Sequence, residues 1–302
     1  MAGTMRVAAL QMRSGPEPEG NIEQLAGLVA EAAAGGTTYL LSPEVTIAFA
    51  ENAEGLRQVA NPFENNWALG QVADLARKHR VTLHLGSLAV ALPDGRFANR
   101  SVVFAPDGSV AATYDKIHLF DATLPNLKHY RESATYRGGD RAVLADVAGV
   151  RLGLSICYDI RFAALYLALA RAGAQVIAVP AAFTVPTGQA HWEVLLRARA
   201  IETGAFIIAA AQGGAHPNGR STYGHSLVVS PWGEVIAERD NDEPGVLLAE
   251  LDLSEVAEAR SRVPALNNAR PFAMQGDNGD GVTFEPKGSM NADHFRQTAR
   301  PT

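Results

Sequence analysis

The chain alternates between short apolar runs and longer segments in which apolar residues recur every three or four positions. The short runs predict buried strands at 7–12, 38–42, 81–91, 100–105 and 110–114. Helical spacing predicts one helix that begins with Asn21 as its N-cap and ends at Gly35-Gly36, and a second helix over 65–79. The turns at 93–95 and 106–108 both read Pro-Asp-Gly, which favours hairpins between the neighbouring strands.

The second half of the chain repeats this order. Apolar runs predict strands at 143–147, 151–156, 175–179, 206–211, 225–230, 234–238 and 246–251. Helical spacing predicts helices over 160–172 and 189–203, ended by Gly173 and Gly204. Strands and helices that alternate in both halves predict an α/β fold with packed sheets inside and helices outside.

The pattern predicts one large domain and a short tail. Within 5–260 we find no linker rich in proline, glycine and serine. The periodicity fades near Pro264, and 275–302 places four glycines among polar residues. We therefore assign 1–272 to one domain and 273–302 to a tail, which is either an arm on a partner subunit or partly disordered.

Composition narrows the class of protein. The 302 residues are 47% hydrophobic and 19% charged, as in packed globular proteins. The net charge of −6 gives no reason to expect nucleic acid as a partner. No apolar run approaches the roughly 18 residues of a membrane span, and the first apolar stretch is too short for a signal peptide. We expect a cytoplasmic protein without a membrane partner.

The sequence holds one cysteine, Cys157, which has no internal disulfide partner. A lone cysteine is commonly a buried structural residue. Cys157, however, follows the apolar run 152–156 at the point where a helix is expected to begin, and free backbone N–H groups at such a position favour a thiolate. The position leaves a structural cysteine and a nucleophile about equally supported.

A thiol nucleophile also needs a base and a group that stabilises developing negative charge. His118, His191 and His225 are candidate bases, although structural roles explain each of them equally well. Glu44 and Lys116 are more informative, because each follows an apolar strand. If Glu44, Lys116 and Cys157 end three strands of one layer, they converge at one rim, which is where open α/β sheets place their chemistry.

Three sequence blocks carry a family resemblance: Ser42-Pro43-Glu44, DKIHLFD at 115–121 and SICYDIRF at 155–162. In this order they resemble the nitrilase superfamily of carbon–nitrogen hydrolases, over about 5–272. The resemblance implies a four-layer αββα sandwich that pairs into a homodimer or a higher homo-oligomer. It also implies a catalytic triad of Glu44, Lys116 and Cys157, with Glu132 as a supporting second glutamate.

Later blocks at 190–203, 210–213 and 221–226 are similar to the branch that contains the deaminated-glutathione amidases. The branch implies cleavage of the γ-amide of deaminated glutathione into 2-oxoglutarate and cysteinylglycine through a cysteine thioester. The alternative within the same chemistry is an ω-amidase that releases ammonia from 2-oxoglutaramate or 2-oxosuccinamate. From another class, the alternative is an inactive scaffold protein. A nitrile hydrolase is disfavoured because Tyr158 stands where true nitrilases have Trp.

The resemblance also suggests roles for individual groups. Glu44 is expected to take the Cys157 proton, with the Lys116 charge favouring the thiolate. The Lys116 ammonium and the backbone N–H of Tyr158 are expected to hold the oxyanion. An anionic substrate needs a cationic partner, for which we select Arg161, and three aromatic residues are expected to line the pocket: Phe49, Phe183 and Trp192. We expect no cofactor, and no metal since the histidines lack ligand spacing.

Overall fold

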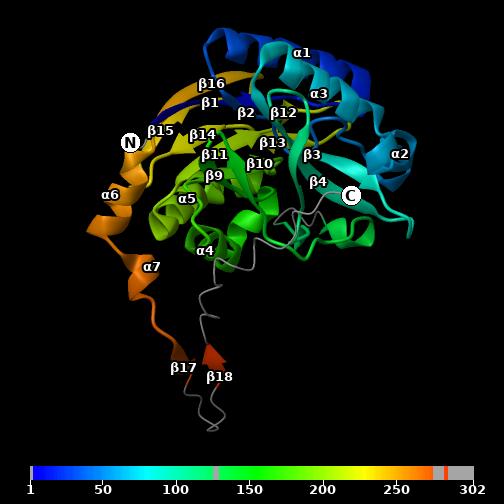
Figure 1. Cartoon of the computed structure of the whole chain (residues 1–302). Coiled ribbons are helices and arrows are strands. Elements are labelled where there is room, and N and C mark those ends of the chain that lie inside the picture. The colour runs from blue at the N-terminus through cyan, green and yellow to red at the C-terminus, as the bar shows by residue number, and fades with distance from the viewer. Residues whose placement is uncertain (1–2, 125–128, 275–281, 285–302) are drawn as a thin grey trace, which may run out of the picture.

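Two six-stranded sheets packed face to face form the centre of the computed structural model, which describes residues 3–124, 129–274 and 282–284 (Figure 1). In the first sheet the strand order is β16-β1-β2-β3-β4-β5. Its three central strands β1, β2 and β3 are parallel, and the other neighbours pair antiparallel. The bounds are β1 (Thr4–Gln11), β2 (Tyr39–Leu41), β3 (Thr82–Ala91), β4 (Phe97–Phe104), β5 (Val110–Asp115) and β16 (Gly245–Asp252).

The second sheet has the same plan. Its order is β15-β14-β11-β10-β9-β8, with β9, β10 and β11 parallel. The bounds are β8 (Leu144–Val147), β9 (Val150–Leu154), β10 (Val176–Ala181), β11 (Phe206–Ala211), β14 (Leu227–Val229) and β15 (Val235–Glu238). The six residues of β11 are all buried, which explains why the sequence shows an unbroken apolar run there.

Helices cover the outer face of each sheet, so that four layers result. In β1, Val7 and Ala9 belong to the core between the two sheets, whereas Ala8 and Leu10 pack in a second core beneath α1 (Pro18–Ala34) and α3 (Trp67–His79). On the second sheet the cover is α4 (Ala163–Arg171) and α5 (Val185–Thr203). Figure 1 shows the two helix pairs on opposite sides of the sheets. The predicted αββα sandwich is confirmed.

Short elements connect these layers, and apart from the one at 157–161 they were not predicted, because they are too short or too polar to show a clear period. Among the residues that the structure describes, three 3₁₀ helices lie in loops between the longer elements. The remaining elements are α2 (Ala53–Val59), η1 (Phe63–Asn65), β6 (Asp121–Thr123), β7 (His129–Arg131), η2 (Glu132–Ala134), η3 (Cys157–Arg161), β12 (Gly213–Ala215), β13 (Ser221–Tyr223), α6 (Ser254–Arg262), α7 (Ala265–Asn268), β17 (Phe272–Met274) and β18 (Val282–Phe284).

Three predicted helix starts are wrong, among them that of the helix expected over 189–203, because α5 begins at Val185. The first helix begins at Pro18, where the fixed φ of proline suits the first turn. Asn21 lies inside it, where the buried side chain bonds the backbone of Gly15 and the carbonyl of Ile47. The helix expected over 160–172 is divided into η3 and α4, which begins at Ala163.

The proposed domain, 1–272, remains a prediction, although both sheets share one hydrophobic core. Most of the predicted tail, 273–302, lies outside the described residues. Its described part pairs β17 with β18 in a two-stranded sheet. None of the helices in the described ranges combines the length and the apolar character that crossing a bilayer requires.

Candidate active site

Glu44 lies three residues beyond the end of β2, on a backbone held in a strained conformation. Val45 has φ +52°, an unfavourable value for a β-branched residue. The surrounding hydrogen bonds hold this geometry: the Val45 N–H donates to Ser87 Oγ at 2.9 Å, and Gln212 Nε2 donates to the Glu44 carbonyl at 3.0 Å. Strain of this kind persists where the surroundings specify it, and it is concentrated at functional sites.

Strand β3 approaches the same segment closely at Gly86. A Cβ atom there would lie 2.0 Å from the Ser42 carbonyl oxygen and 2.4 Å from that of Pro43. The Gly86 N–H instead donates to Ser42 Oγ at 3.0 Å. Glycine at this position therefore lets β3 support the loop that carries Glu44.

Cys157 begins η3 just after β9 and has φ +48°, which is again unusual for a residue other than glycine. The fully buried Asp159 fixes this turn. Its carboxylate accepts from the Ile156 N–H at 2.9 Å, from Tyr114 Oη at 2.6 Å and from the His118 N–H at 3.0 Å. The nucleophile candidate thus lies on a turn that is connected to both sheets.

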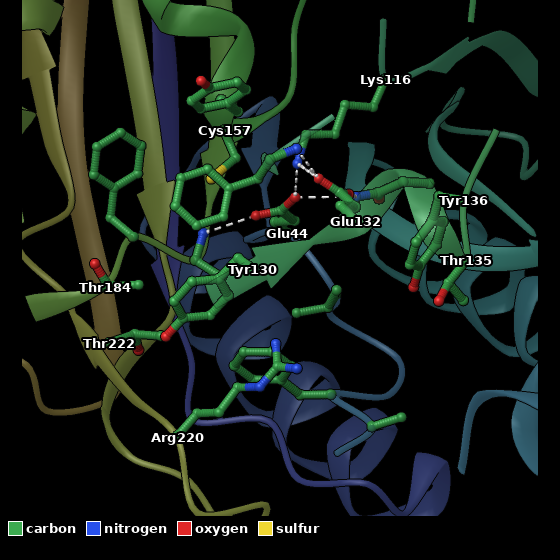
Figure 2. A pocket seen from close by; sticks show the side chains of 18 of the residues that line it. Glu44, Lys116, Tyr130, Glu132, Thr135, Tyr136, Cys157, Thr184, Arg220 and Thr222 are labelled. Carbon is green, nitrogen blue, oxygen red and sulfur yellow. Dashed lines mark hydrogen bonds and ion pairs between the residues drawn. The ribbon is translucent and has the colours of Figure 1, made fainter. Parts of the chain in front are cut away.

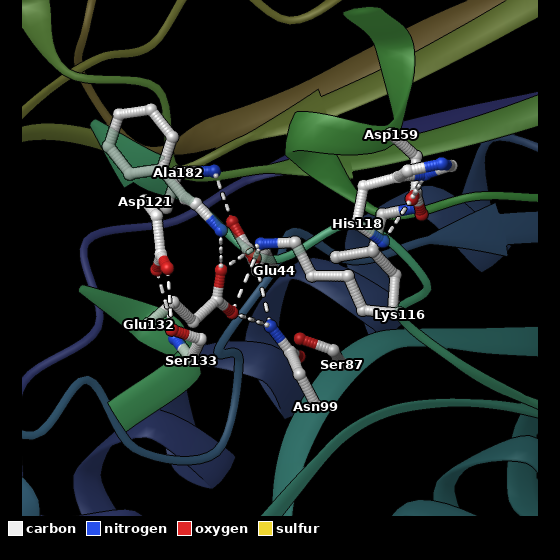
Figure 3. Close-up of polar contacts among 12 residues, drawn as sticks. Glu44, Ser87, Asn99, Lys116, His118, Asp121, Glu132, Ser133, Asp159 and Ala182 are labelled. Carbon is white, nitrogen blue, oxygen red and sulfur yellow. Dashed lines mark hydrogen bonds and ion pairs between the residues drawn. The ribbon is translucent and has the colours of Figure 1, made fainter. Parts of the chain in front are cut away.

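Lys116 follows β5 and lies between two carboxylates, as Figure 3 shows. Its Nζ is 2.8 Å from Glu44 Oε1 and 2.9 Å from Glu132 Oε2. The Lys116 side chain is only 2% exposed, so this is a buried ion-paired cluster. The Ala182 N–H donates to Glu44 Oε2 at 3.0 Å, and the Phe120 N–H donates to Glu132 Oε2 at 2.6 Å.

Asn99 joins the two carboxylates and was not predicted. Its Nδ2 donates to Glu44 Oε1 at 3.0 Å and to Glu132 Oε1 at 3.2 Å. Its Oδ1 is buried without a hydrogen-bond partner among the described residues. A buried asparagine inside the apolar strand β4 is the sequence signal that could have identified it, since asparagine is depleted in strands.

The pKa shifts assign protons within the cluster. Burial alone would lower the pKa of Lys116, but the charges of Glu132 and Glu44 outweigh burial and raise it well above its usual value. Burial, and next the Glu44 charge, raise the pKa of the Cys157 thiol well above its usual range, although Lys116 acts in the opposite sense. These directions favour an ammonium on Lys116 and a neutral thiol on Cys157, so the Lys116 charge does not by itself bring the thiol pKa down.

We expect the Glu44→Gln substitution to lower the pKa of the Cys157 thiol. The Glu44 carboxylate raises that pKa and the Lys116 charge lowers it, so loss of the carboxylate leaves the lysine opposed by burial alone. The thiolate absorbance in a pH titration measures the shift, with Cys157→Ala protein subtracted to remove the tyrosine signal. The exposed Glu64→Gln variant is the control, and a midpoint that stays or rises in Glu44→Gln contradicts this electrostatic account.

The cluster opens into a cavity of about 290 Å³. Glu44, Lys116, Glu132 and Cys157 lie in its wall, and Figure 2 shows them facing one another. Tyr158, whose backbone N–H is the predicted oxyanion donor, and the predicted pocket residues Arg161, Phe49 and Phe183 also line it.

Trp192 does not line the cavity, so that prediction is wrong. Its side chain is 1% exposed and packs behind Phe183, with the ring centroids 4.8 Å apart. The indole Nε1 donates to the His225 carbonyl at 2.8 Å. Trp192 therefore supports the wall from behind.

The cluster lies between the two sheets, which differs from the expected rim of one layer. Glu44 and Lys116 come from loops of the first sheet, and Cys157 comes from the second. Among the lining residues we find none of the candidate bases His118, His191 and His225. Within the described ranges, no three histidine, cysteine, aspartate or glutamate side chains gather in a metal-binding arrangement.

The sequence is similar to those of known carbon–nitrogen hydrolases over most of its length. Residues 6–261 match the model of the carbon-nitrogen hydrolase family. The deaminated glutathione amidase of Bos taurus is 40% identical over 270 residues, which are 88% of this chain and 82% of that protein. The deaminated glutathione amidase of Yersinia enterocolitica is 37% identical, over 87% of this chain and 92% of that protein.

Solved structures show the same similarity. The NitFhit protein of C. elegans superposes with a TM-score of 0.82 and 36% identity, over 89% of this chain and 66% of that one. An amidase from Nesterenkonia sp. AN1 superposes with a TM-score of 0.71 and 26% identity, over 88% of this chain and 97% of that one. The latter is a Glu-to-Gln mutant that shows covalent addition of the acetamide moiety of fluoroacetamide at its active-site cysteine.

Proposed function

Because the chain belongs to the carbon–nitrogen hydrolase family, we propose that it is an amidase that cleaves the γ-amide of deaminated glutathione. The products are 2-oxoglutarate and cysteinylglycine. One observation carries the proposal: the Glu44–Lys116–Cys157 cluster opens into a cavity that also contains arginine side chains. Such a cavity suits an anionic amide.

Acylation starts from the neutral thiol and the charged glutamate. Glu44 accepts the thiol proton as Cys157 Sγ attacks the amide carbonyl carbon, so the thiolate forms only as it reacts. The carbonyl oxygen becomes an oxyanion, which the Lys116 ammonium and the Tyr158 N–H stabilise. Glu44 then gives its proton to the amide nitrogen as the C–N bond breaks, leaving a thioester on Cys157.

Deacylation uses the same groups in reverse. Glu44 removes a proton from water as the water oxygen attacks the thioester carbonyl carbon. The second oxyanion collapses, the C–S bond breaks, and the proton returns from Glu44 to the sulfur. Glu132 bonds Lys116 through both carboxylate oxygens, at 2.9 and 3.1 Å, and thereby holds the ammonium in position.

Arg161 binds the carboxylate of the 2-oxoacyl part in this proposal. It belongs to the same short helix as Cys157, and its guanidinium carbon lies 5.5 Å from the centroid of Phe183 and 5.8 Å from that of Tyr158. Its Nη2 lies 3.3 Å from His191 Nδ1. Among the described residues no carboxylate pairs with Arg161, which leaves its fork geometry for a substrate carboxylate.

A product assay tests the proposed function. We expect the purified protein to release 2-oxoglutarate and cysteinylglycine from deaminated glutathione with a higher kcat/KM than it releases ammonia from 2-oxoglutaramate. Higher kcat/KM for 2-oxoglutaramate would assign the chain to ω-amidase chemistry. Failure to hydrolyse either amide would favour an inactive scaffold.

We also propose that the chain assembles with a second copy of itself. An exposed apolar face combines α5 with the turn before β15: Val194, Ile201 and Trp232 are 68, 58 and 51% exposed. Arg197 Nε on α5 donates to the Gly233 carbonyl at 2.8 Å, so the turn that carries Trp232 lies against this helix.

Ile201→Glu is expected to convert the assembly to monomers, since it places a charge in the centre of this apolar face. Molar mass by light scattering measures the change. The matched control is Val110→Glu, at a 47% exposed position on the edge strand β5. The proposed interface is contradicted if the wild-type protein is a monomer, or if Ile201→Glu and Val110→Glu lower the molar mass equally.

A further inference from the structure

Arg220 lines the cavity together with the cations Lys116, Arg131 and Arg161, and neither the proposed mechanism nor the sequence prediction gives it a role. It precedes β13, and its guanidinium carbon lies 5.2 Å from the centroid of the Phe49 ring. Its Nη2 donates to the Glu51 carbonyl at 3.2 Å. Within the described residues it forms no ion pair, in contrast to Arg100, which pairs bidentately with Asp115 at 2.6 and 2.9 Å.

The backbone that carries Arg220 is firmly held. The Arg220 N–H donates to Asn218 Oδ1 at 3.0 Å, and Asn218 Nδ2 donates to the Phe49 carbonyl at 2.7 Å. The buried His216 joins the turn to the rest of the site, with Nε2 at 2.6 Å from Thr222 Oγ1 and Nδ1 at 2.9 Å from the Ser14 carbonyl. The backbone of Arg220 is therefore fixed in position, and contacts with the Phe49 ring and the Glu51 carbonyl orient its side chain.

The charge of Arg220 acts on Tyr136, a residue that also feels the charges of the catalytic cluster. Burial and the carboxylates Glu132 and Glu44 raise the pKa of the Tyr136 hydroxyl, and Lys116 and Arg220 oppose them. Both Tyr136 and Arg220 line the cavity. A substrate carboxylate that enters this space meets two glutamates, so an unpaired guanidinium there lowers the cost of binding an anion.

Figure 2 shows Cys157 and Arg220 at two ends of the pocket, with Tyr130 and Thr222 between them. Arg161, by contrast, belongs to the same five-residue helix as Cys157. Among the arginines that line the cavity, which include Arg131, Arg161 thus belongs to the helix of the nucleophile and Arg220 lies at the other end of the pocket.

Resting on the proposed function, we propose that Arg220 binds the terminal carboxylate of the leaving peptide, while Arg161 binds that of the acyl part. Deaminated glutathione carries a carboxylate on each side of the scissile amide. The acyl arm is short, with two methylene groups and a keto carbon before its carboxylate. The leaving arm contains a cysteine residue and a glycine, so its carboxylate reaches farther, which matches the more distant Arg220.

This assignment explains how the site distinguishes a peptide leaving group from ammonia. A 2-oxo-acid amide such as 2-oxoglutaramate has the acyl carboxylate but no leaving-group carboxylate. It uses Arg161 and leaves Arg220 unoccupied. Arg220 is then a specificity-determining residue, and it contributes only when the leaving group is anionic.

The test compares three substrates in wild-type protein and in Arg220→Met. The substrates are deaminated glutathione, the same compound with its glycine carboxylate converted to the amide, and 2-oxoglutaramate. We expect Arg220→Met to lower kcat/KM for deaminated glutathione by roughly 10- to 100-fold. We expect less than about 2-fold change for the other two substrates, because neither carries the charge that Arg220 binds.

Two further variants separate binding from structure. Arg220→Lys keeps the charge and is expected to recover part of the loss, whereas Arg57→Met, at an exposed arginine outside the cavity, is expected to change none of the three values. Independently of any variant, the wild type is expected to prefer the free acid over its amide by a similar factor.

Equal kcat/KM for acid and amide in the wild type would overturn the subsite. So would an equal loss for all three substrates in Arg220→Met, which would indicate a structural role. Wild-type protein that does not cleave deaminated glutathione would overturn the proposed function, and the subsite with it. Cleavage of that substrate without discrimination at the carboxylate would overturn the subsite alone.

Discussion

Replacing Cys157 with alanine is expected to reduce the turnover of deaminated glutathione by about 10⁴-fold or more, because loss of the nucleophile removes the covalent route altogether. The fold should tolerate the change, since the turn at Cys157 is held by Asp159 and not by the sulfur. Release of cysteinylglycine measures the loss, and thermal unfolding checks the fold.

Cys157→Ser is the matched variant, because it keeps a nucleophilic atom but raises the cost of ionising it. We expect it to be nearly as inactive as Cys157→Ala. If the alanine variant retained more than about one hundredth of the wild-type rate, the catalytic group would have to lie elsewhere, since such a residual rate exceeds what binding and oxyanion stabilisation alone supply.

Lys116→Met is expected to damage both stability and catalysis. The ammonium separates Glu44 from Glu132, and both carboxylates also bond the same Asn99 amide nitrogen. Without the cation, two buried negative charges face each other, which costs about 3–5 kcal/mol of unfolding free energy. Loss of the oxyanion partner is expected to lower kcat by roughly 10²- to 10³-fold.

Urea unfolding and steady-state kinetics measure these two losses separately. Lys78→Met, at an exposed lysine in the last turn of α3, is the control and should change neither value. A Lys116→Met protein with wild-type stability would show that the cluster is not ion-paired as described. Wild-type kcat would show that the ammonium does not stabilise the oxyanion.

The sequence pattern predicted most strands because buried parallel strands are apolar on both faces. The runs at 206–211 and 175–179 correspond to β11 and β10, which lie in the middle of the second sheet. Helix α2 was not predicted, since only Leu56 of its seven residues is buried. Local periodicity also does not specify strand order, so the division into two sheets had to come from the structure.

The sequence likewise identified some residues of the candidate site and missed others. Glu44, Lys116 and Cys157 could be selected from their positions after strands and from the family resemblance. Asn99 and Asp159 escaped selection, although each is buried and bonded to the cluster or to the turn at Cys157. Their roles depend on pairings distant in the chain: Asn99 bonds Glu44 and Asp159 bonds Tyr114.

The pKa of Cys157 depends on burial and on the Glu44 charge, which the neighbouring sequence does not show. Its position at a helix start and near a lysine favoured a thiolate. Burial and the Glu44 carboxylate outweigh both effects, and they raise the pKa of the thiol. The consequence is mechanistic: the base must take the proton during attack, so Glu44 has to lie beside the sulfur throughout acylation.

The central claim is that the amide is cleaved through a thioester on Cys157, and acid-quenched mass spectrometry during turnover of deaminated glutathione tests it most directly. We predict that the peptide containing Cys157 gains the mass of a 2-oxoglutaryl group, and that hydroxylamine removes the added mass. The same peptide from Cys157→Ala protein should gain nothing. Full-rate hydrolysis with no acyl group on Cys157, or an acyl group found equally in the alanine variant, would contradict the account.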